Sequence, residues 1–235
     1  MDFNLYSHLS QALNWLAPNK CYGCLKILSR PPPFCDACYI ELPFQSNTCQ
    51  QCGQAYAANR DYCGRCIITP PAYDRCFCPF EYQTPIKDLI CGFKYREKVE
   101  HANMIGQLLA REIKNKEEPM PDIIMPVPIH IARLRSRGFN QAKLIATIVG
   151  RELSVPVTHK IIIKTRSTPP QAKQSLANRK KALSGCFAVQ QPFSAKNVAI
   201  VDDVVTTGST VNEISKVLKK NGANYVQVWG VAHTL

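Results

Sequence analysis

The sequence predicts an α/β fold, in which a mostly parallel sheet flanked by helices follows a small cysteine-rich module. Two observations predict it. Eight cysteines form four C-x2-C pairs before residue 67, and from Tyr73 onward apolar strand-like runs alternate with segments of helical periodicity. We therefore expect an N-terminal helix at 1–19, the cysteine-rich module at 20–72 and the α/β domain at 73–235.

The first segment is read as a helix because Leu5, Leu9, Leu13 and Leu16 repeat at helical spacing. It lacks the basic start and continuous apolar core of a signal peptide. Packing on the protein is favoured over binding to a membrane surface, since the polar face lacks Lys and Arg. The 235 residues contain no apolar run of 18, so we expect no transmembrane segment and a cytoplasmic protein.

The cysteine-rich module contains an internal duplication. Each cysteine of the first set recurs 28 positions later, and every set reads C-x2-C, ten residues, C-x2-C. Two such knuckles supply the four sulfurs of a closed structural zinc site, so we expect two zinc ions. Redox activity of the pairs is the rival interpretation. Pairing within each repeat is simpler than cross-bracing, which the spacing leaves open. The predicted ligands are Cys21, Cys24, Cys35 and Cys38, then Cys49, Cys52, Cys63 and Cys66.

The other four cysteines are predicted to be small buried hydrophobes. Cys76 and Cys78 lie in an alternating, strand-like stretch, and Cys91 and Cys186 have apolar neighbours.

The elements of the α/β domain follow from periodicity. We expect helices at 103–116, 139–153 and 211–222, and strands at 122–130, 157–163, 197–201 and 225–232. Positive charge concentrates in the same domain. Residues 126–181 hold twelve Lys or Arg and one acid, Glu152, and so carry +11 of the net +12. This favours an anionic partner, either nucleic acid or a polyphosphate metabolite, over a merely solvated surface.

The stretch IVDDVVTTGST (200–210) joins the third of these strands to the last helix. Ligands bind at the carboxyl edge of parallel sheets, and the start of the helix, near Ser209 or Thr210, offers backbone N–H groups to a phosphate. Gly208 permits close approach of the backbone. Asp202 and Asp203 suit the vicinal hydroxyls of a ribose or a magnesium ion. The pattern predicts a ribose 5-phosphate site; the alternative is an ordinary acidic pair at a helix entry.

The same stretch resembles the PRPP-binding motif of type I phosphoribosyltransferases. The resemblance extends to the ComF family of competence proteins, including GntX-like members, and it covers nearly the whole chain. The segments that carry it are the paired cysteine knuckles, FKYR (93–96), PVPIH (126–130), RSRGFNQA (135–142), TPPQAKQS (168–175) and VDDVVTTGST (201–210).

This resemblance implies a phosphoribosyltransferase-like domain that carries a zinc-binding module, in proteins tied to DNA uptake. It implies that Asp202 and Asp203, the candidate catalytic residues, hold the ribose hydroxyls. Residues 168–181 resemble a mobile flap; here Arg179, Lys180 and Lys181 precede Ala182 where relatives often have Arg-x-x-Asn. The implied phosphate ligands are Thr206, Thr207, Gly208, Ser209 and Thr210, with Arg133, Arg135 and Arg137 in the loop after Pro128 for pyrophosphate.

Three functions are compatible with these residues. The first hypothesis is a DNA-uptake protein that handles incoming single-stranded DNA, with a site for PRPP and Mg²⁺ and contacts to other competence proteins such as a helicase. The second is a catalytic phosphoribosyltransferase, whose acceptor the sequence does not identify. The third is an interaction adaptor with a decayed PRPP site.

Overall fold

The computed structural model describes residues 20–28, 33–56, 61–95, 100–116, 118–166 and 182–234. The chain divides into two compact units, 1–42 and 43–235, with the boundary between the two cysteine repeats. The expected N-terminal helix at 1–19 and the whole of the flap-like segment 168–181 lie outside the described residues. In the part of the chain that is described, no helix is both long and apolar enough to cross a membrane.

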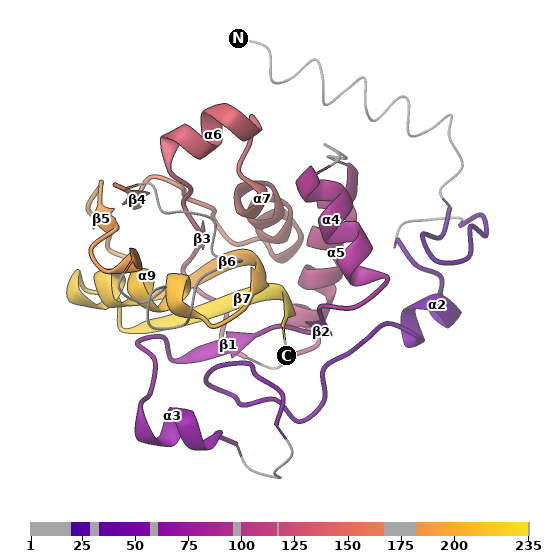
Figure 1. Cartoon of the computed structure of the whole chain (residues 1–235), viewed down its shortest axis with the longest axis horizontal. Helices are drawn as coiled ribbons and strands as arrows, with labels where there is room; N and C mark the ends of the chain where they lie inside the picture. Colours follow the sequence, from indigo (N-terminus) through magenta and orange to yellow (C-terminus); the bar gives the residue numbers. More distant parts are fainter. Residues whose placement is uncertain are drawn as a thin grey trace. The chain divides into compact units, whose positions relative to one another are not determined.

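A parallel five-stranded sheet forms the centre of the larger unit (Figure 1). Its strand order is β1-β7-β6-β3, and β2 also pairs with β7. Every pairing in this sheet is parallel, as expected for an α/β domain. The strands are β1 (Arg75–Phe77), β2 (Phe80–Glu81), β3 (Ile123–Pro126), β6 (Asn197–Val205) and β7 (Tyr225–His233).

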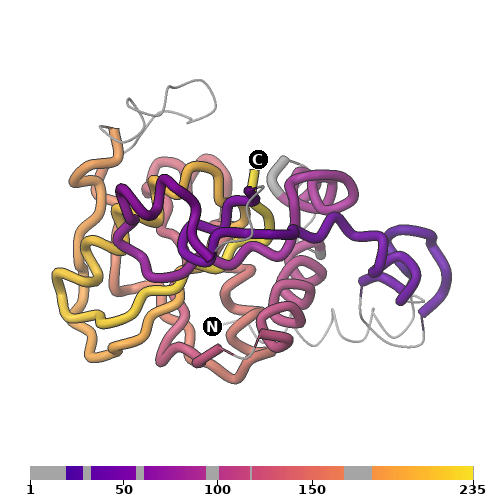
Figure 2. The backbone as a smooth tube through the Cα atoms, turned by 90° about the horizontal axis from the view of Figure 1, so that it is seen from below, coloured from indigo at the N-terminus to yellow at the C-terminus, as the bar shows by residue number. Residues whose placement is uncertain are grey.

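Helices pack against this sheet because its strands are apolar on both faces. Val198 and Ile200 share a core cluster with Val211, Ile214 and Leu218 of α9. α7 packs on β3 and β6 and also against α5. Figure 2 shows α4 and α5 side by side as neighbouring magenta coils. The helices are α4 (Ile86–Tyr95), α5 (Glu100–Lys114), α7 (Gln141–Leu153) and α9 (Ser209–Lys220).

Several elements differ from the sequence-based expectation, and the strand expected at 122–130 already ends at Pro126. The strand expected at 157–163 is reduced to a bridge between Val157 and Ile124 and to β4 (Ile162–Lys164), which pairs antiparallel with β5 (Phe187–Val189) in a separate sheet. β6 continues to Val205, because Val204 and Val205 still pair with β7. The segment after Pro128 is not a loop but contains α6 (Ile131–Arg137), which His130 caps and Gly138 ends in a left-handed conformation.

The two cysteine repeats have the same local fold. The bridge between Lys20 and Ile27 recurs 28 residues later between Thr48 and Ala55. In each repeat the second C-x2-C pair begins a short helix, α2 (Asp36–Ile40) or α3 (Gly64–Ile68), whose N-cap is the third cysteine. The duplication in the sequence is therefore a duplication of structure.

Candidate functional site

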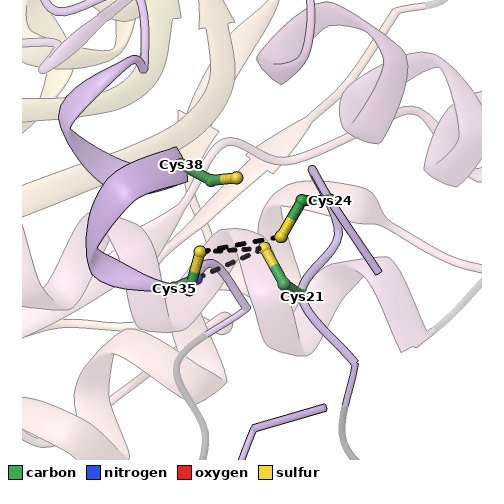
Figure 3. Close-up of side chains that lie close together, drawn as sticks. All are labelled: Cys21, Cys24, Cys35 and Cys38. Atoms are coloured by element: carbon green, nitrogen blue, oxygen red, sulfur yellow. Dashed lines mark hydrogen bonds between the residues drawn. The ribbon is translucent and has the colours of Figure 1, made fainter. Parts of the chain in front are cut away.

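Each repeat brings its four cysteines into one cluster. The four Sγ atoms of a cluster all lie within 4.8 Å of one another. Figure 3 shows the first cluster, in which Cys35 Sγ lies 3.7 Å from Cys21 Sγ and 3.8 Å from Cys24 Sγ. In the second cluster Cys52 Sγ and Cys63 Sγ are 3.7 Å apart. Four sulfurs at the usual Zn–S distance of about 2.3 Å in a tetrahedron are about 3.8 Å apart, so both clusters fit zinc.

The surroundings of the first cysteine in each repeat favour its thiolate form. Cys21 Sγ accepts a hydrogen bond from the Cys35 N–H at 3.3 Å, and Cys49 Sγ accepts the matching bond from the Cys63 N–H at 3.3 Å. Burial alone would raise the pKa of both thiols, but backbone N–H donors lower the pKa of Cys21 to about 6 and that of Cys49 to about 7. Metal ligation requires this deprotonated form.

The clusters also resolve the pairing that spacing left open, because each contains cysteines from a single repeat and none is cross-braced among the described residues. Of the other cysteines, Cys76, Cys78 and Cys186 are buried, as predicted. Cys91 is only half-buried, and its Sγ lies 3.3 Å from Tyr82 Oη.

A cavity of about 350 Å³ opens at the carboxyl edge of the parallel sheet. It lies where β3 and β6 end and α9 begins, the position at which α/β sheets bind ligands. Its lining brings together segments that are far apart in the sequence. The polar and charged residues among them are Tyr82, Arg133, Arg137, Asn140, Gln141, Lys164, Asp202, Asp203, Thr206, Ser209, Thr210 and Thr234.

The loop between β6 and α9 forms one wall of this cavity. Gly208 is the N-cap of α9 and adopts a left-handed conformation, with φ of 69°. Thr206, Ser209 and Thr210 line the cavity beside it. Thr207 does not line the cavity; its Oγ1 lies 2.8 Å from Ser209 Oγ and so braces the loop internally.

The acidic pair lies in the strand rather than at the helix entry, since β6 extends to Val205 and α9 begins only at Ser209. Asp202 Oδ1 accepts the N–H of Asp203 at 2.9 Å, and Asp203 Oδ1 accepts the N–H of Val204 at 2.7 Å. Both residues line the cavity, although Asp203 is only 8% exposed. The backbone thus fixes two carboxylates at the edge of the cavity, which is not the arrangement of an N-cap.

Cationic side chains line the same cavity as these carboxylates. Arg133 and Arg137 of α6 both line it, whereas Arg135, between them on the same helix, does not. Lys164 of β4 joins them and was not predicted. Burial lowers the pKa of Lys164 and the charge of Arg133 adds to this effect, against an opposing contribution from Cys186. An anion bound beside Lys164 would favour its charged form.

Two amide side chains in the lining were also missed as site residues, although both lie in the RSRGFNQA segment. Asn140 Nδ2 donates to Val127 O at 3.0 Å, and Gln141 Oε1 accepts from Arg137 Nη1 at 2.9 Å. These hydrogen bonds distinguish the oxygen atom from the nitrogen atom in each side-chain amide. The opposite atoms, Asn140 Oδ1 and Gln141 Nε2, are buried without a hydrogen-bond partner among the described residues.

Comparison with known sequences supports the zinc-binding module and finds relatives that cover most of the chain. A family described as the double zinc ribbon domain matches residues 12–67. DNA utilization protein YhgH of Escherichia coli K12 is 35% identical over 205 residues, which cover 86% of this chain and 90% of that protein. Competence protein F of Haemophilus influenzae is 33% identical over 219 residues, which cover 90% of this chain and 89% of that protein.

Two phosphoribosyltransferases are among the solved structures that align with part of this chain. Adenine phosphoribosyltransferase from Trypanosoma brucei, solved with AMP, pyrophosphate and ribose-5-phosphate, aligns with a TM-score of 0.38 at 22% identity and covers 60% of this chain and 55% of its own. Purine phosphoribosyltransferase from Pyrococcus horikoshii aligns with a TM-score of 0.35 at 21% identity and covers 57% and 73%. At these TM-scores, the family assignment rests on the sequence relatives.

The fold and the cysteine clusters define a class of protein in which a parallel sheet flanked by helices follows a double zinc ribbon. Within that class, the chain belongs to the family of competence protein F and DNA utilization protein YhgH.

Proposed function

We propose that this protein serves DNA uptake by handling incoming single-stranded DNA in the cytoplasm, and that its cavity binds a ribose 5-phosphate of the PRPP type. The observation that carries the proposal is the lining of one cavity by a phosphate-type loop, a carboxylate pair and three cationic side chains.

The loop suits the 5-phosphate. Backbone N–H groups at the start of α9 and the hydroxyls of Thr206, Ser209 and Thr210 are donors to a phosphate, and Gly208 has no side chain to block its approach. The partial positive charge at the N-terminus of this 12-residue helix favours an anion at the same place.

The carboxylates suit the rest of a phosphoribosyl ligand. Asp202 and Asp203 are acceptors, which repel phosphate but match the paired hydroxyls of ribose and the oxygen coordination that Mg²⁺ prefers. Arg133 and Arg137 supply planar, bidentate donors for pyrophosphate, with Lys164 as a third cation. In this assignment Arg135 lies outside the cavity and is available to a polyanion on the surface.

The DNA-related part of the proposal draws on two independent sources of support. Two relatives carry the names DNA utilization protein and competence protein. Residues 126–181 of this chain carry +11 of the net +12, which attracts a phosphate backbone without reading its sequence.

The ligand assignment is tested by comparing ribose 5-phosphate with 2-deoxyribose 5-phosphate in calorimetric titrations with Mg²⁺. The native protein should prefer ribose by about tenfold, because the deoxy sugar leaves carboxylate acceptors unpaired. Asp202→Asn with Asp203→Asn should abolish this preference, while Glu213→Gln, which neutralises a carboxylate outside the cavity lining, should retain it. Equal affinities for the two sugars in the native protein would refute the diol assignment.

The DNA assignment is tested by titrating labelled single-stranded DNA at one fixed salt concentration, with and without saturating PRPP and Mg²⁺. We expect binding that PRPP shifts, since the two ligands share the basic region. Pyrophosphate release from PRPP in the presence of an acceptor base would instead identify a catalytic phosphoribosyltransferase. Failure to bind either PRPP or DNA would leave the adaptor function and refute the proposal.

A further inference from the structure

Tyr73 connects the second zinc ribbon to the loop between β6 and α9 (206–208), which is called the phosphate loop below because the proposed function places a phosphate there. It lies between the last cysteine of that ribbon and β1, and it is only 2% exposed. A Cβ atom added to Gly208 would lie 2.6 Å from Tyr73 Oη, closer than such atoms approach without a shift of one of them. The phenol hydroxyl is therefore packed directly against the backbone of the loop, at the residue that caps α9.

The segment that carries Tyr73 is held on both sides. On the side of the sheet, the N–H of Ala72 donates to Asn212 Oδ1 of α9 at 2.7 Å. On the side of the ribbon, the Cys76 N–H donates to Gln50 O at 3.3 Å, and Gln51 Nε2 lies 3.5 Å from Tyr73 O.

Gln50 and Gln51 lie between two predicted zinc ligands, Cys49 and Cys52, so a zinc ion bound there would fix the turn that makes these contacts. The next residue, Gly53, packs on β1 in the same way: a Cβ added there would lie 3.0 Å from Cys76 Sγ. The second ribbon, Tyr73 and the start of α9 thus form one continuous packed path within the larger unit.

The first ribbon has different residues at the positions that make these contacts. Its residues at the matching positions, 28 earlier, are Tyr22 and Gly23 in place of Gln50 and Gln51, and it belongs to the other compact unit. The duplication therefore produced two metal sites of the same local fold, and the second is packed against the element that carries the phosphate loop.

The buried phenol is also suited to a position next to an anion. Burial raises the pKa of Tyr73 well above its ordinary value. The side chain therefore stays neutral at physiological pH and places no negative charge under a loop that receives phosphate.

We infer that Tyr73 is a positioning residue for the phosphate loop and that the zinc of the second ribbon holds it there, so that phosphate affinity depends on the second metal site and not on the first. The ligand part of this inference rests on the proposed function, whereas the ordering of residues 206–212 does not.

The repeat supplies matched variants for the test. Cys24→Ser and Cys52→Ser remove equivalent ligands, 28 residues apart, and each should lower the zinc content by one ion per chain. Hydrogen exchange of the peptide 206–212, which reports local opening, should rise in Cys52→Ser and stay unchanged in Cys24→Ser. Affinity for ribose 5-phosphate with Mg²⁺ should fall about tenfold or more in Cys52→Ser only, because a displaced loop no longer meets the phosphate.

Tyr73→Ala tests the residue without touching a metal ligand. It should retain both zinc ions and raise exchange of 206–212, with Tyr73→Phe intermediate because the ring remains. If Cys52→Ser proves unfolded, Tyr73→Ala alone decides. Unchanged exchange in Tyr73→Ala, or equal effects of Cys24→Ser and a folded Cys52→Ser, would overturn the inference. If the native protein binds no ribose 5-phosphate but exchange responds only to Cys52→Ser and Tyr73→Ala, the proposed function fails and the positioning role stands.

Discussion

Gly208 is the single residue on which the shape of the phosphate loop depends most directly. Alanine there must adopt a φ of 69° and must also place its Cβ 2.6 Å from Tyr73 Oη. We expect Gly208→Ala to lower the free energy of unfolding by about 2–5 kcal/mol, the sum of a left-handed backbone and an overpacked contact. Urea denaturation of the zinc-loaded native and variant proteins measures this change in the free energy of unfolding.

Gly138→Ala is the matched control for this change. Gly138 has a φ of 79°, but a Cβ there meets nothing within 4 Å, so only the backbone cost of about 1–2 kcal/mol should remain. Equal losses in the two variants would show that the contact with Tyr73 has no energetic weight.

His233, at the end of β7, is expected to make the stability of the protein depend on pH. Burial lowers its pKa and the charge of Arg65 adds to this effect, against an opposing contribution from Thr234 O, which lies 2.6 Å from Nδ1. Below the unfolded pKa of about 6.5, the unfolded chain binds this proton more readily than the folded one. The contribution of His233 is therefore complete above that pH and is lost as pH falls toward the lower, folded pKa.

The measurement is urea denaturation of the native protein and of His233→Gln between pH 8 and pH 5. The difference between them should change below about pH 6.5 by at most about 1.4 kcal/mol per pH unit, the limit for one proton. Taking this difference removes the pH dependence of zinc binding, which both proteins share. A constant difference across the range would contradict the role of His233.

Residues of the site were predictable where they are contiguous in the sequence. One motif contains Asp202, Asp203 and the loop to Thr210, and its residue types already indicate hydrogen-bond acceptors followed by hydrogen-bond donors to a phosphate. Lys164, Asn140 and Gln141 were missed because they reach the cavity from β4 and from the start of α7. Their position depends on how distant segments pack, which local periodicity does not encode.

At the scale of elements, the contact between α5 and α7 depends on a glycine. A Cβ on Gly106 would lie 2.6 Å from Ile148 Cγ2 across the two helices. Alanine is favoured over glycine in a helix by about 1 kcal/mol, but forcing an atom into a packed contact costs about 1–3 kcal/mol. We expect Gly106→Ala to destabilise the protein by up to about 2 kcal/mol in thermal or urea unfolding.

A double-mutant cycle with Ile148→Ala checks the cause. Removing Cγ2 should relieve part of the clash, so the double variant should be more stable than the sum of the single changes predicts, by about 1 kcal/mol. Strict additivity would mean that the helices separate freely and that the close approach is not a constraint.

The elements that the sequence predicts correctly are those whose own residues form a clear apolar pattern with a recognisable end. β7 and α9 combine apolar runs with a clear end, Asn221-Gly222 in the case of α9. α6 was missed because its seven residues are too few for an apolar period, and its signals are a His N-cap and a Gly C-cap. The strand expected at 157–163 failed because its apolar residues are divided between two different sheets.

At the scale of the whole molecule, the duplication yields two zinc sites in unlike surroundings. Cys24 is exposed, whereas its counterpart Cys52 is 2% exposed. The two repeats also differ at positions 37 and 65, which are Ala and Arg. The thiolates of Cys52 and Cys66 raise the pKa of Arg65 against the opposing effect of burial, so Arg65 is a positive charge beside the second cluster.

These differences predict that the two zinc ions leave at different rates. A mercurial thiol reagent in excess, with a chromogenic chelator to report free zinc, should release them in two phases of equal amplitude. The phase of the first ribbon should be about tenfold faster or more, since thiolate reactivity follows exposure. Cys24→Ser should lack the fast phase and Cys52→Ser the slow one. Arg65→Ala should accelerate only the slow phase, because the charge beside the second cluster is lost. A single phase of zinc release in the native protein would mean that the folded domain gives the second ribbon no protection.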